Sequence, residues 1–225
     1  AAGDRLLGHA EAAELAMRAG EEALTGPSDT LSGQIRIGAP DGCANYLLPQ
    51  VVAGIVAGNP GLEVQIVAQP RVFNLTRREA DMVIAVSRPE QGRVIATKIT
   101  DYRLSLAASR AYLATAPALN ALSDLQAHRV IGYIPDMIFD RELDYLANLG
   151  VDQAPLASNS VSVQLNLIRQ GAGVGVVHDF ALQAAPGVER VLTQDFGLKR
   201  AFHLVRHADD RKVPRIERFS EALIT

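Results

Sequence analysis

The amino-acid sequence predicts an α/β fold, and three observations support this class. Short runs rich in β-branched residues recur along the chain, and between them lie longer segments whose apolar residues have helical spacing. The first strand, helix and second strand follow one another in the order of a β-α-β unit. The chain has 225 residues, 48% hydrophobic and 21% charged, which suits one large or two small globular domains.

The opening β-α-β unit is the clearest of these patterns. Residues 33–38 (GQIRIG) alternate between apolar and polar side chains and predict a strand. Residues 43–57 have helical spacing, which stops at the Gly, Asn and Pro of residues 58–60. Residues 62–68 (LEVQIVA) predict the second strand. Because a helix connects the two strands, they are expected to pair in parallel.

The middle of the chain continues with short apolar runs. Strand-like runs occupy residues 81–86, 94–100 and 103–109, and a helical patch at residues 109–117 precedes another strand-like run at residues 129–134.

The second half repeats the alternation of helices and strands. We predict helices over residues 137–150, 162–171 and 213–224, and strands over residues 173–177 and 201–207. The first of these helices ends at a glycine, which is a common helix stop.

A glycine-rich segment, IRQGAGVGVVHDF at residues 168–180, raises the question of a phosphate-binding loop. A dinucleotide site needs a strand that runs into the glycines and a helix that leaves them. The order here is the reverse, so nucleotide binding is not expected. Gly171 is predicted as a helix C-cap, and Gly173 and Gly175 are predicted to allow a tight turn and a close backbone approach at the start of a buried strand.

The N-terminal segment, residues 1–26, predicts a helix with a narrow seam. Apolar or small residues recur at alternating spacings of four and three, at Leu6, Ala10, Ala13, Met17, Gly20 and Leu24. One interpretation is a dimerisation helix, joined to the body by the flexible residues 25–33 (TGPSDTLSG). The other is a single amphipathic helix that lies on its own domain.

The charge distribution argues against nucleic-acid binding by this chain alone. Residues 1–26 hold two basic and five acidic residues, and the rest of the chain holds 20 of each. Binding to phosphates requires a surplus of Lys and Arg, which is missing.

The sequence has no apolar run near the roughly 18 residues of a membrane span, and no signal peptide. Cys43 is the only cysteine, so no intramolecular disulfide is possible and a cytoplasmic location is expected. The first residue is not methionine, which indicates a fragment of a longer polypeptide.

Three segments together resemble a known family. They are residues 31–66 (LSGQIRIGAPDGCANYLLPQVVAGIVAGNPGLEVQI), residues 78–89 (READMVIAVSRP) and residues 163–177 (VQLNLIRQGAGVGVV). In this order they resemble the effector-binding domain of a LysR-type transcriptional regulator, and the acidic, alanine-rich residues 1–26 resemble the linker helix that precedes it. The resemblance covers essentially the whole chain.

The resemblance implies two Rossmann-like subdomains of the type II periplasmic-binding-protein kind, joined by crossing strands. The first would hold residues 31–108 and 205–225, and the second residues 109–204, with a small-molecule cleft between them. It also implies a homodimer or homotetramer, with contacts through the N-terminal helix and through residues 47–56 and 62–68. DNA would be bound only by an N-terminal winged helix-turn-helix, which is expected to be missing here.

The loop after the first strand is a candidate anion site, since ligands of open α/β sheets bind at the carboxyl ends of strands. Backbone amides around Gly42, Cys43 and Ala44 are candidates to hold a carboxylate. Family members often have Ser or Thr here, whereas this chain has Asp41, Gly42 and Cys43. Asp41 would repel an anion unless it caps its own helix.

Further candidates follow the other strands. Arg71 would pair with an anionic effector or be an ordinary surface arginine. Val86 and Ser87 match family positions that face the ligand, and Tyr133 and Phe139 would form the opposite wall of the cleft or belong to the core.

The last candidates lie at helix starts in the second half. Ser160 and Ser162 would cap a helix or bind the effector, and capping is favoured. His178 stands where family members frequently have proline; it would contact the ligand or, as we favour, begin a helix beside Asp179. No metal site is expected, because His9, His128, His203 and His207 lack ligand spacing.

We therefore expect a sensor of a small organic effector, an anion, with no cofactor. Two other classes of protein stay open. A stand-alone solute-binding protein shares the fold, and an enzyme would use Cys43 as a nucleophile at a helix N-terminus. A nucleophile needs a positioned base, and the sequence assigns none.

Overall fold

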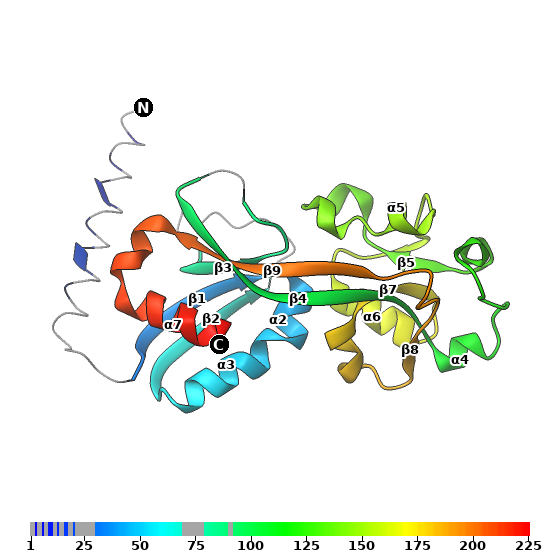
Figure 1. Cartoon of the computed structure of the whole chain (residues 1–225), viewed down its shortest axis with the longest axis horizontal. Coiled ribbons are helices and arrows are strands. Elements are labelled where there is room, and N and C mark those ends of the chain that lie inside the picture. Colours follow the sequence, from blue (N-terminus) through cyan, green and yellow to red (C-terminus); the bar gives the residue numbers. More distant parts are fainter. Residues whose placement is uncertain are drawn as a thin grey trace.

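The computed structural model describes residues 3, 6, 9, 10, 13, 16, 17, 20, 30–68, 79–89 and 92–225. Two lobes lie side by side, and two long strands, β4 (Val94–Ser109) and β9 (Leu198–His207), run through both of them (Figure 1). The sequence-based divisions after Ala108 and Leu204 fall within these two strands. The mixed sheet with helices on it confirms the predicted α/β class.

The first lobe is built on the predicted parallel unit. It contains β1 (Ser32–Ala39), β2 (Gly61–Ala68), β3 (Met82–Ala85), α2 (Asp41–Tyr46), α3 (Leu48–Ala57) and α7 (Pro214–Ile224). Strand β1 pairs in parallel with both β2 and β3, and Ile35 lies opposite Val64. The prediction of a parallel β-α-β unit is confirmed.

One helix of the prediction is two helices in the structure. The chain leaves helical geometry between Tyr46 and Leu48, where the amide of Leu47 still bonds to the carbonyl of Cys43. Pro49, in the first turn of α3, has no amide hydrogen to bond back to Asn45. The helix therefore restarts at the proline, which helical spacing alone did not reveal.

The two crossing strands differ from the expected short runs. Residues 94–100 and 103–109 form one 16-residue strand, β4, which pairs antiparallel with β9 and has an irregular register between Lys98 and Thr100. Strand β9 also pairs with β3, and β4 also pairs with β7, so both lobes share one sheet. Within the described residues its order is β2-β1-β3-β9-β4-β7-β5-β6, with β8 on β4.

The second lobe contains the shorter elements. They are β5 (Val130–Gly132), β6 (Leu156–Ala157), β7 (Val174–His178), β8 (Val188–Arg190), α4 (Arg110–Leu113), α5 (Leu146–Leu149) and α6 (Val161–Arg169). Short 3₁₀ turns connect them, at Leu122–Ala127, Pro135–Met137, Arg141–Leu143 and Asp179–Ala184, and another, Ala208–Lys212, precedes α7.

The predicted continuous helix over residues 137–150 is wrong. The segment begins at the last residue of the 3₁₀ turn Pro135–Met137 and otherwise contains the 3₁₀ turn Arg141–Leu143 and the one-turn helix α5. The Asp140 carboxylate accepts a hydrogen bond from the amide of Glu142, and Asp144 adopts a non-helical conformation (φ −81°, ψ 89°). Short acidic side chains compete with helical backbone bonds in this way. Gly150 ends α5 with φ 65°, as predicted.

The glycine-rich segment confirms the structural interpretation. Gly171 follows α6 with φ 75°, the left-handed geometry of a helix end. A Cβ on Gly173 would lie 2.1 Å from the carbonyl oxygen of Arg129, and a Cβ on Gly175 would lie 2.9 Å from that of Ile131. These glycines therefore let β7 approach β5 closely.

The main hydrophobic cluster extends through both lobes, because β4 and β9 contribute to each. Phe202 of β9 and Phe219 of α7 are among its largest fully buried side chains. The described residues of the N-terminal segment are helical, and those of its seam are exposed, with Leu6 at 71% and Met17 at 69%. Among the described residues, no helix is long and apolar enough to cross a membrane.

Candidate functional site

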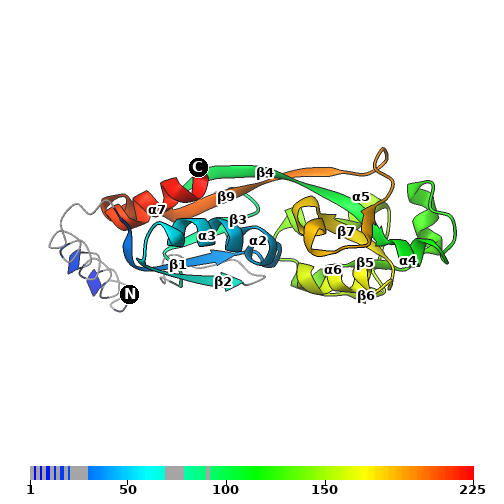
Figure 2. The ribbon, with the colours of Figure 1, turned by 90° about the horizontal axis from the view of Figure 1, so that it is seen from below.

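The two lobes meet where α2 of the first lobe contacts α6 of the second (Figure 2). The Asp41 carboxylate forms this contact. One of its oxygens, Oδ2, accepts hydrogen bonds from the amide of Ser162 at 2.9 Å and from the hydroxyls of Ser160 and Ser162 at 3.1 Å each. An acidic side chain is favourable there, because the first turn of a helix presents free amides and a positive dipole.

Asp41 is therefore not the cap of its own helix, which was one expectation. It is the first residue of α2, which Pro40 precedes without a side-chain cap, and its carboxylate serves α6 instead. Ser160 is the predicted cap of α6, since its hydroxyl accepts a hydrogen bond from Val163. The predicted amide cradle is reduced as well, because the amide of Ala44 already bonds to the carbonyl of Pro40.

Gly42 keeps the lobes close together. A Cβ at this position would lie 3.2 Å from Cε1 of His178 and 3.3 Å from a methyl group of Val161, both in the second lobe. Such distances are tighter than ordinary side-chain contacts, so glycine suits this position because it has no side chain.

Behind this contact lies a stack of buried rings. The ring of Tyr102 in β4 stacks on Phe202 at a centroid distance of 4.1 Å and on His178 at 5.3 Å. Tyr145 and Tyr133, both buried, meet edge to face at 5.8 Å. Thus β4, β9 and the second lobe all contribute rings to one region.

Three buried polar atoms in this region have no hydrogen-bond partner within the described part of the chain. They are the hydroxyls of Tyr102 and Tyr145 and Nδ1 of His178. Buried polar groups are nearly always paired, so three such atoms in one region require an explanation.

The protonation of this region follows from its burial. Desolvation lowers the pKa of His178 to about 4, against the smaller opposing effect of Asp41 and Asp179, so the ring is neutral near pH 7. Burial raises the pKa of Tyr102 and Tyr145, and the nearby Arg200 guanidinium partly offsets the increase. Both hydroxyls therefore keep their protons.

Cys43, a residue of α2, has a buried thiol. Burial raises its pKa to about 12, so the thiolate is essentially absent at neutral pH. Nucleophilic cysteines need the opposite environment, one that lowers the pKa.

A second set of contacts crosses between the lobes on another side. The Ser87 hydroxyl, which follows β3, donates a hydrogen bond to the Asp140 carboxylate of the second lobe. Arg200 of β9 pairs with Glu142. Beside them is a cavity of about 490 Å³, which we call the hinge groove; it is lined by residues 86–88, Asp101, Glu142, residues 199–201 and His203.

The structure separates the predicted site residues into groups. Asp41, Gly42, Ser160, Ser162 and His178 meet at the lobe interface. Val86 and Ser87 line the hinge groove instead.

The remaining candidates belong to the core or lie beyond the described residues. Cys43, Ala44 and Tyr133 are buried in the main hydrophobic cluster, and Phe139 packs against it. His178 directly precedes the 3₁₀ turn Asp179–Ala184, as we favoured, although its ring also contacts the interface. Arg71 lies outside the described residues.

Sequence reasoning missed Tyr102, Tyr145, Arg200 and His203. Tyr102 stands in the middle of a 16-residue strand, and only the pairing of β4 with β9 and β7 brings it beneath the interface. The alternation of side chains along residues 201–207 could have indicated the surroundings of two of the missed positions, because it places Phe202 and His203 on opposite faces of β9. Among the residues that the structure describes, no group of three or more His, Cys, Asp or Glu side chains is arranged to hold a metal.

Comparison with known proteins relates this architecture to regulators of transcription. The family model of the LysR substrate binding domain matches residues 28–225. The HTH-type transcriptional regulator PtxR of Pseudomonas aeruginosa is 26% identical over 154 residues, which cover 66% of this chain and 49% of that protein. The chain thus spans about half the length of this curated relative.

Solved structures show the same fold. The regulatory domain of CrgA, a LysR-type transcriptional regulator from Neisseria meningitidis, superposes with a TM-score of 0.77 at 19% identity and covers 86% of this chain and 98% of that one. Full-length AphB, a virulence activator of Vibrio cholerae, superposes with a TM-score of 0.71 at 19% identity; the match covers 99% of this chain and 78% of that one.

Proposed function

The chain belongs to the LysR substrate binding domain family, and from this premise we propose that it senses a small organic effector at the lobe interface. The observation that carries the proposal is the group of three buried polar atoms on Tyr102, Tyr145 and His178 that have no partner among the described residues. The division into residues 31–108 with 205–225 and residues 109–204 is part of this proposal.

The effector's chemistry follows from what surrounds these atoms. The tyrosine hydroxyls donate hydrogen bonds to an acceptor, and the neutral His178 ring accepts or donates one according to its tautomer. Stacked rings favour a planar or apolar portion in the effector. An anionic group is supported by Arg200, whose charge acts on both tyrosine hydroxyls, and it would avoid the Asp41 carboxylate.

The regulatory mechanism uses the contacts between the lobes. The lobes would have two arrangements: one in which Asp41 bonds to Ser160 and Ser162, and one in which these bonds are absent. An effector at the interface alters the balance between the two arrangements. The shift is limited by the effector's differential affinity for the two arrangements. In the whole regulator, such a shift changes how subunits present their DNA-binding domains.

We propose a homodimer or homotetramer. The described seam residues of the N-terminal helix are exposed, which favours a partner helix over packing against the helix's own domain. The small exposed residues Ala53, Gly54 and Ala57 of α3 support the side-by-side contact of effector domains that the family resemblance implies. A cytoplasmic location is also part of the proposal.

The two other classes are less favoured. A stand-alone solute-binding protein shares the fold, but family membership and the exposed N-terminal seam support a regulator. Catalysis through Cys43 is opposed by the pKa of about 12 of this buried thiol, so we propose that the chain is not an enzyme.

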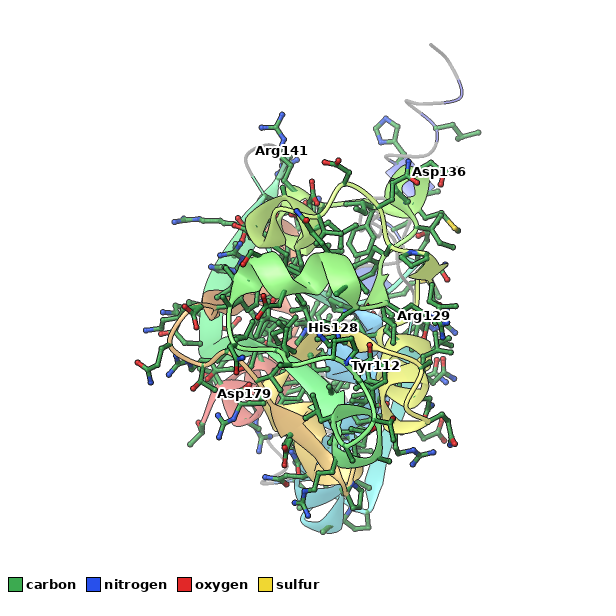
Figure 3. All side chains as sticks on the ribbon, turned by 90° about the vertical axis from the view of Figure 1, so that its right-hand side faces the viewer. Tyr112, His128, Arg129, Asp136, Arg141 and Asp179 are labelled. Carbon is green, nitrogen blue, oxygen red and sulfur yellow. The ribbon has the colours of Figure 1, made fainter. Side chains whose placement is uncertain are left out.

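A thermal-shift screen tests the proposed function. We would screen small carboxylates, aromatic acids, amino acids and phosphorylated metabolites, because a ligand that binds only the folded state raises the melting temperature. We expect a saturable shift that Tyr145→Phe weakens strongly. Tyr112→Phe is the matched control, because its hydroxyl bonds to His128 at 3.0 Å near the end of the second lobe (Figure 3). A shift that survives Tyr102→Phe and Tyr145→Phe would count against this site.

A further inference from the structure

The hinge groove takes its lining from three parts of the fold. Residues 86–88 follow β3 in the first lobe, Glu142 belongs to the second lobe, and Lys199, Ala201 and His203 lie along β9. Its volume of about 490 Å³ accommodates a small organic molecule. A ligand there would touch both lobes and a strand that joins them.

The groove borders the interface region around Tyr102, and Arg200 belongs to both, since it lines the groove and its charge acts on the Tyr102 hydroxyl. Phe202 of β9 is fully buried and stacks on Tyr102. Side chains alternate between the two faces of a strand, so Ala201 and His203 face away from that stack. The chain therefore has two neighbouring surfaces at which a ligand would contact both lobes, and Arg88 and His203 belong to the groove alone.

Both carboxylates of the groove already have cationic partners. Asp101 lies 2.7 Å from the ammonium group of Lys98 and 3.0 Å from that of Lys199, and Glu142 pairs with Arg200. Arg88 is exposed and has no carboxylate partner within the described residues. The lining thus has three permanent cations, on Arg88, Lys199 and Arg200, against two carboxylates.

His203 also lines the groove, and one of its ring nitrogens is unpaired within the described residues. Its Nδ1 atom is buried and has no hydrogen-bond partner within the described part of the chain. Desolvation lowers the pKa of His203, and the charges of Arg88 and Lys98 lower it further. The ring therefore lies in a positive field that a negative ligand would neutralise.

We propose that the hinge groove is a second ligand site, which binds a small oxyanion, a carboxylate or a group such as sulfate, through Arg88 and His203. A guanidinium and an imidazolium both form charge-assisted hydrogen bonds to oxyanions. The site itself does not depend on an effector at the interface. Its regulatory consequence, a bias in the arrangement of the lobes, rests on the proposed function.

Binding at this site is linked to protonation. The charged groups around His203 are Arg88 after β3, Lys98 and Asp101 of β4, Lys199 and Arg200 of β9, and Glu142 of the second lobe. A bound anion offsets the repulsion from the cations and raises the pKa of His203, so binding takes up a proton. The affinity for the anion therefore increases as the pH falls. The total increase is about tenfold for each unit by which the pKa of His203 is higher in the bound than in the free protein.

A sulfate titration followed by NMR tests the site directly. Sulfate keeps its charge throughout the pH range in which histidine titrates, and chloride at matched ionic strength controls for screening. The ring Cε1–H resonance of His203 is assigned by its loss in His203→Gln. We expect sulfate, and not chloride, to shift this resonance saturably, with several-fold tighter binding at about pH 5.5 than at about pH 7.5.

Two variants make the test specific. Arg88→Gln is expected to abolish the saturable shift, whereas Arg169→Gln, at an exposed position on α6, is expected to leave it unchanged. A His203 resonance that ignores sulfate at both pH values, or that responds equally in Arg88→Gln, would overturn the proposal. An effector whose thermal shift depends on Tyr145 would still support the proposed function, because Tyr145 does not line the hinge groove.

Discussion

The lobe interface and the hinge groove place histidines in opposite situations, although both regions join the same two lobes. His178 at the interface is buried to 4% exposure, lies against Tyr102 and Phe180, and has a pKa lowered to about 4. His203 lies in a groove lined by charged side chains, and both desolvation and neighbouring cations lower its pKa. Desolvation is the largest cause in both regions, but the neighbouring charges act in opposite directions, because carboxylates lie near His178 and cations lie near His203.

Under the two proposals, one residue type would serve two kinds of recognition. Deep burial makes His178 a neutral hydrogen-bonding group over the ordinary pH range. The open groove leaves His203 within reach of an anion that would change its protonation. Substitutions made in one region at a time therefore distinguish residues that stabilise the fold from residues that bind a ligand.

The largest effect is expected from Phe202→Ala, which removes the ring that supports Tyr102. A buried Phe→Ala change typically costs about 3–5 kcal/mol, because it loses buried surface and leaves a cavity. Urea unfolding measures the loss. Lys199→Ala, three residues earlier in β9 and exposed, is the control and should change stability little. Comparable losses in both variants would contradict the contrast between the regions.

The pH dependence of stability is expected to reveal His178. Its folded pKa of about 4 lies below the unfolded value of about 6.5, so the unfolded state binds the proton first as the pH falls. The stability contributed by the neutral ring is present above about pH 6.5 and is lost between there and pH 4, on the order of 3 kcal/mol in all. His178→Gln should flatten the dependence of the unfolding free energy on pH in this range, whereas His9→Gln, at an exposed position, should not. Equal pH slopes in wild type and His178→Gln would refute this assignment.

Gly42→Val is expected to destabilise the protein by about 1–3 kcal/mol, because its side chain would overlap His178 and Val161. The overlap occurs at the contact between the lobes, so the arrangement of the lobes should also change. Small-angle scattering measures this change. Gly58→Val, directly after α3, is the matched control, since the nearest atom to a Cβ there is the Ile55 carbonyl oxygen at 3.8 Å, an ordinary contact distance. A Gly42→Val protein as stable as the control would show that the lobes are not held closely at this point.

A smaller effect is expected from Asp41→Ala, which removes three hydrogen bonds to Ser160 and Ser162. We expect a loss of about 1–2 kcal/mol in thermal or urea unfolding, because α6 also loses a favourable charge at its first turn. Asp136→Ala, exposed on the second lobe (Figure 3), serves as the control. If the two variants unfold alike, the contact between the lobes does not contribute to stability.

Much of the fold was accessible from sequence patterns because those patterns are local. The parallel unit of β1 and β2, helix α6 with Gly171 at its end, and strand β9 were all predicted from periodicity and end signals. The errors were local as well. Pro49 splits one helix into two, and acidic side chains break up residues 137–150.

The candidate site was only partly accessible. Ser160 was correctly predicted as a helix cap, because an N-cap is determined by a few neighbouring residues. The role of Asp41 was not, since its partner Ser162 is 121 residues away and no local rule connects them. Tyr102 and Arg200 were overlooked for the same reason, since both lie within long strands.

The sequence by itself determined the α/β class, the order of most elements, the structural role of the three glycines and the resemblance to LysR effector domains, because local periodicity, backbone geometry and motif order encode them. Only the tertiary structure decided that Asp41 caps a helix of the opposite lobe, that Tyr102 stacks between Phe202 and His178, and that Arg88 and His203 share one groove. These pairings arise when β4 and β9 cross between the lobes and bring distant segments together. Such pairings depend on the packing and charges of the whole chain, and a short stretch of sequence does not contain this information.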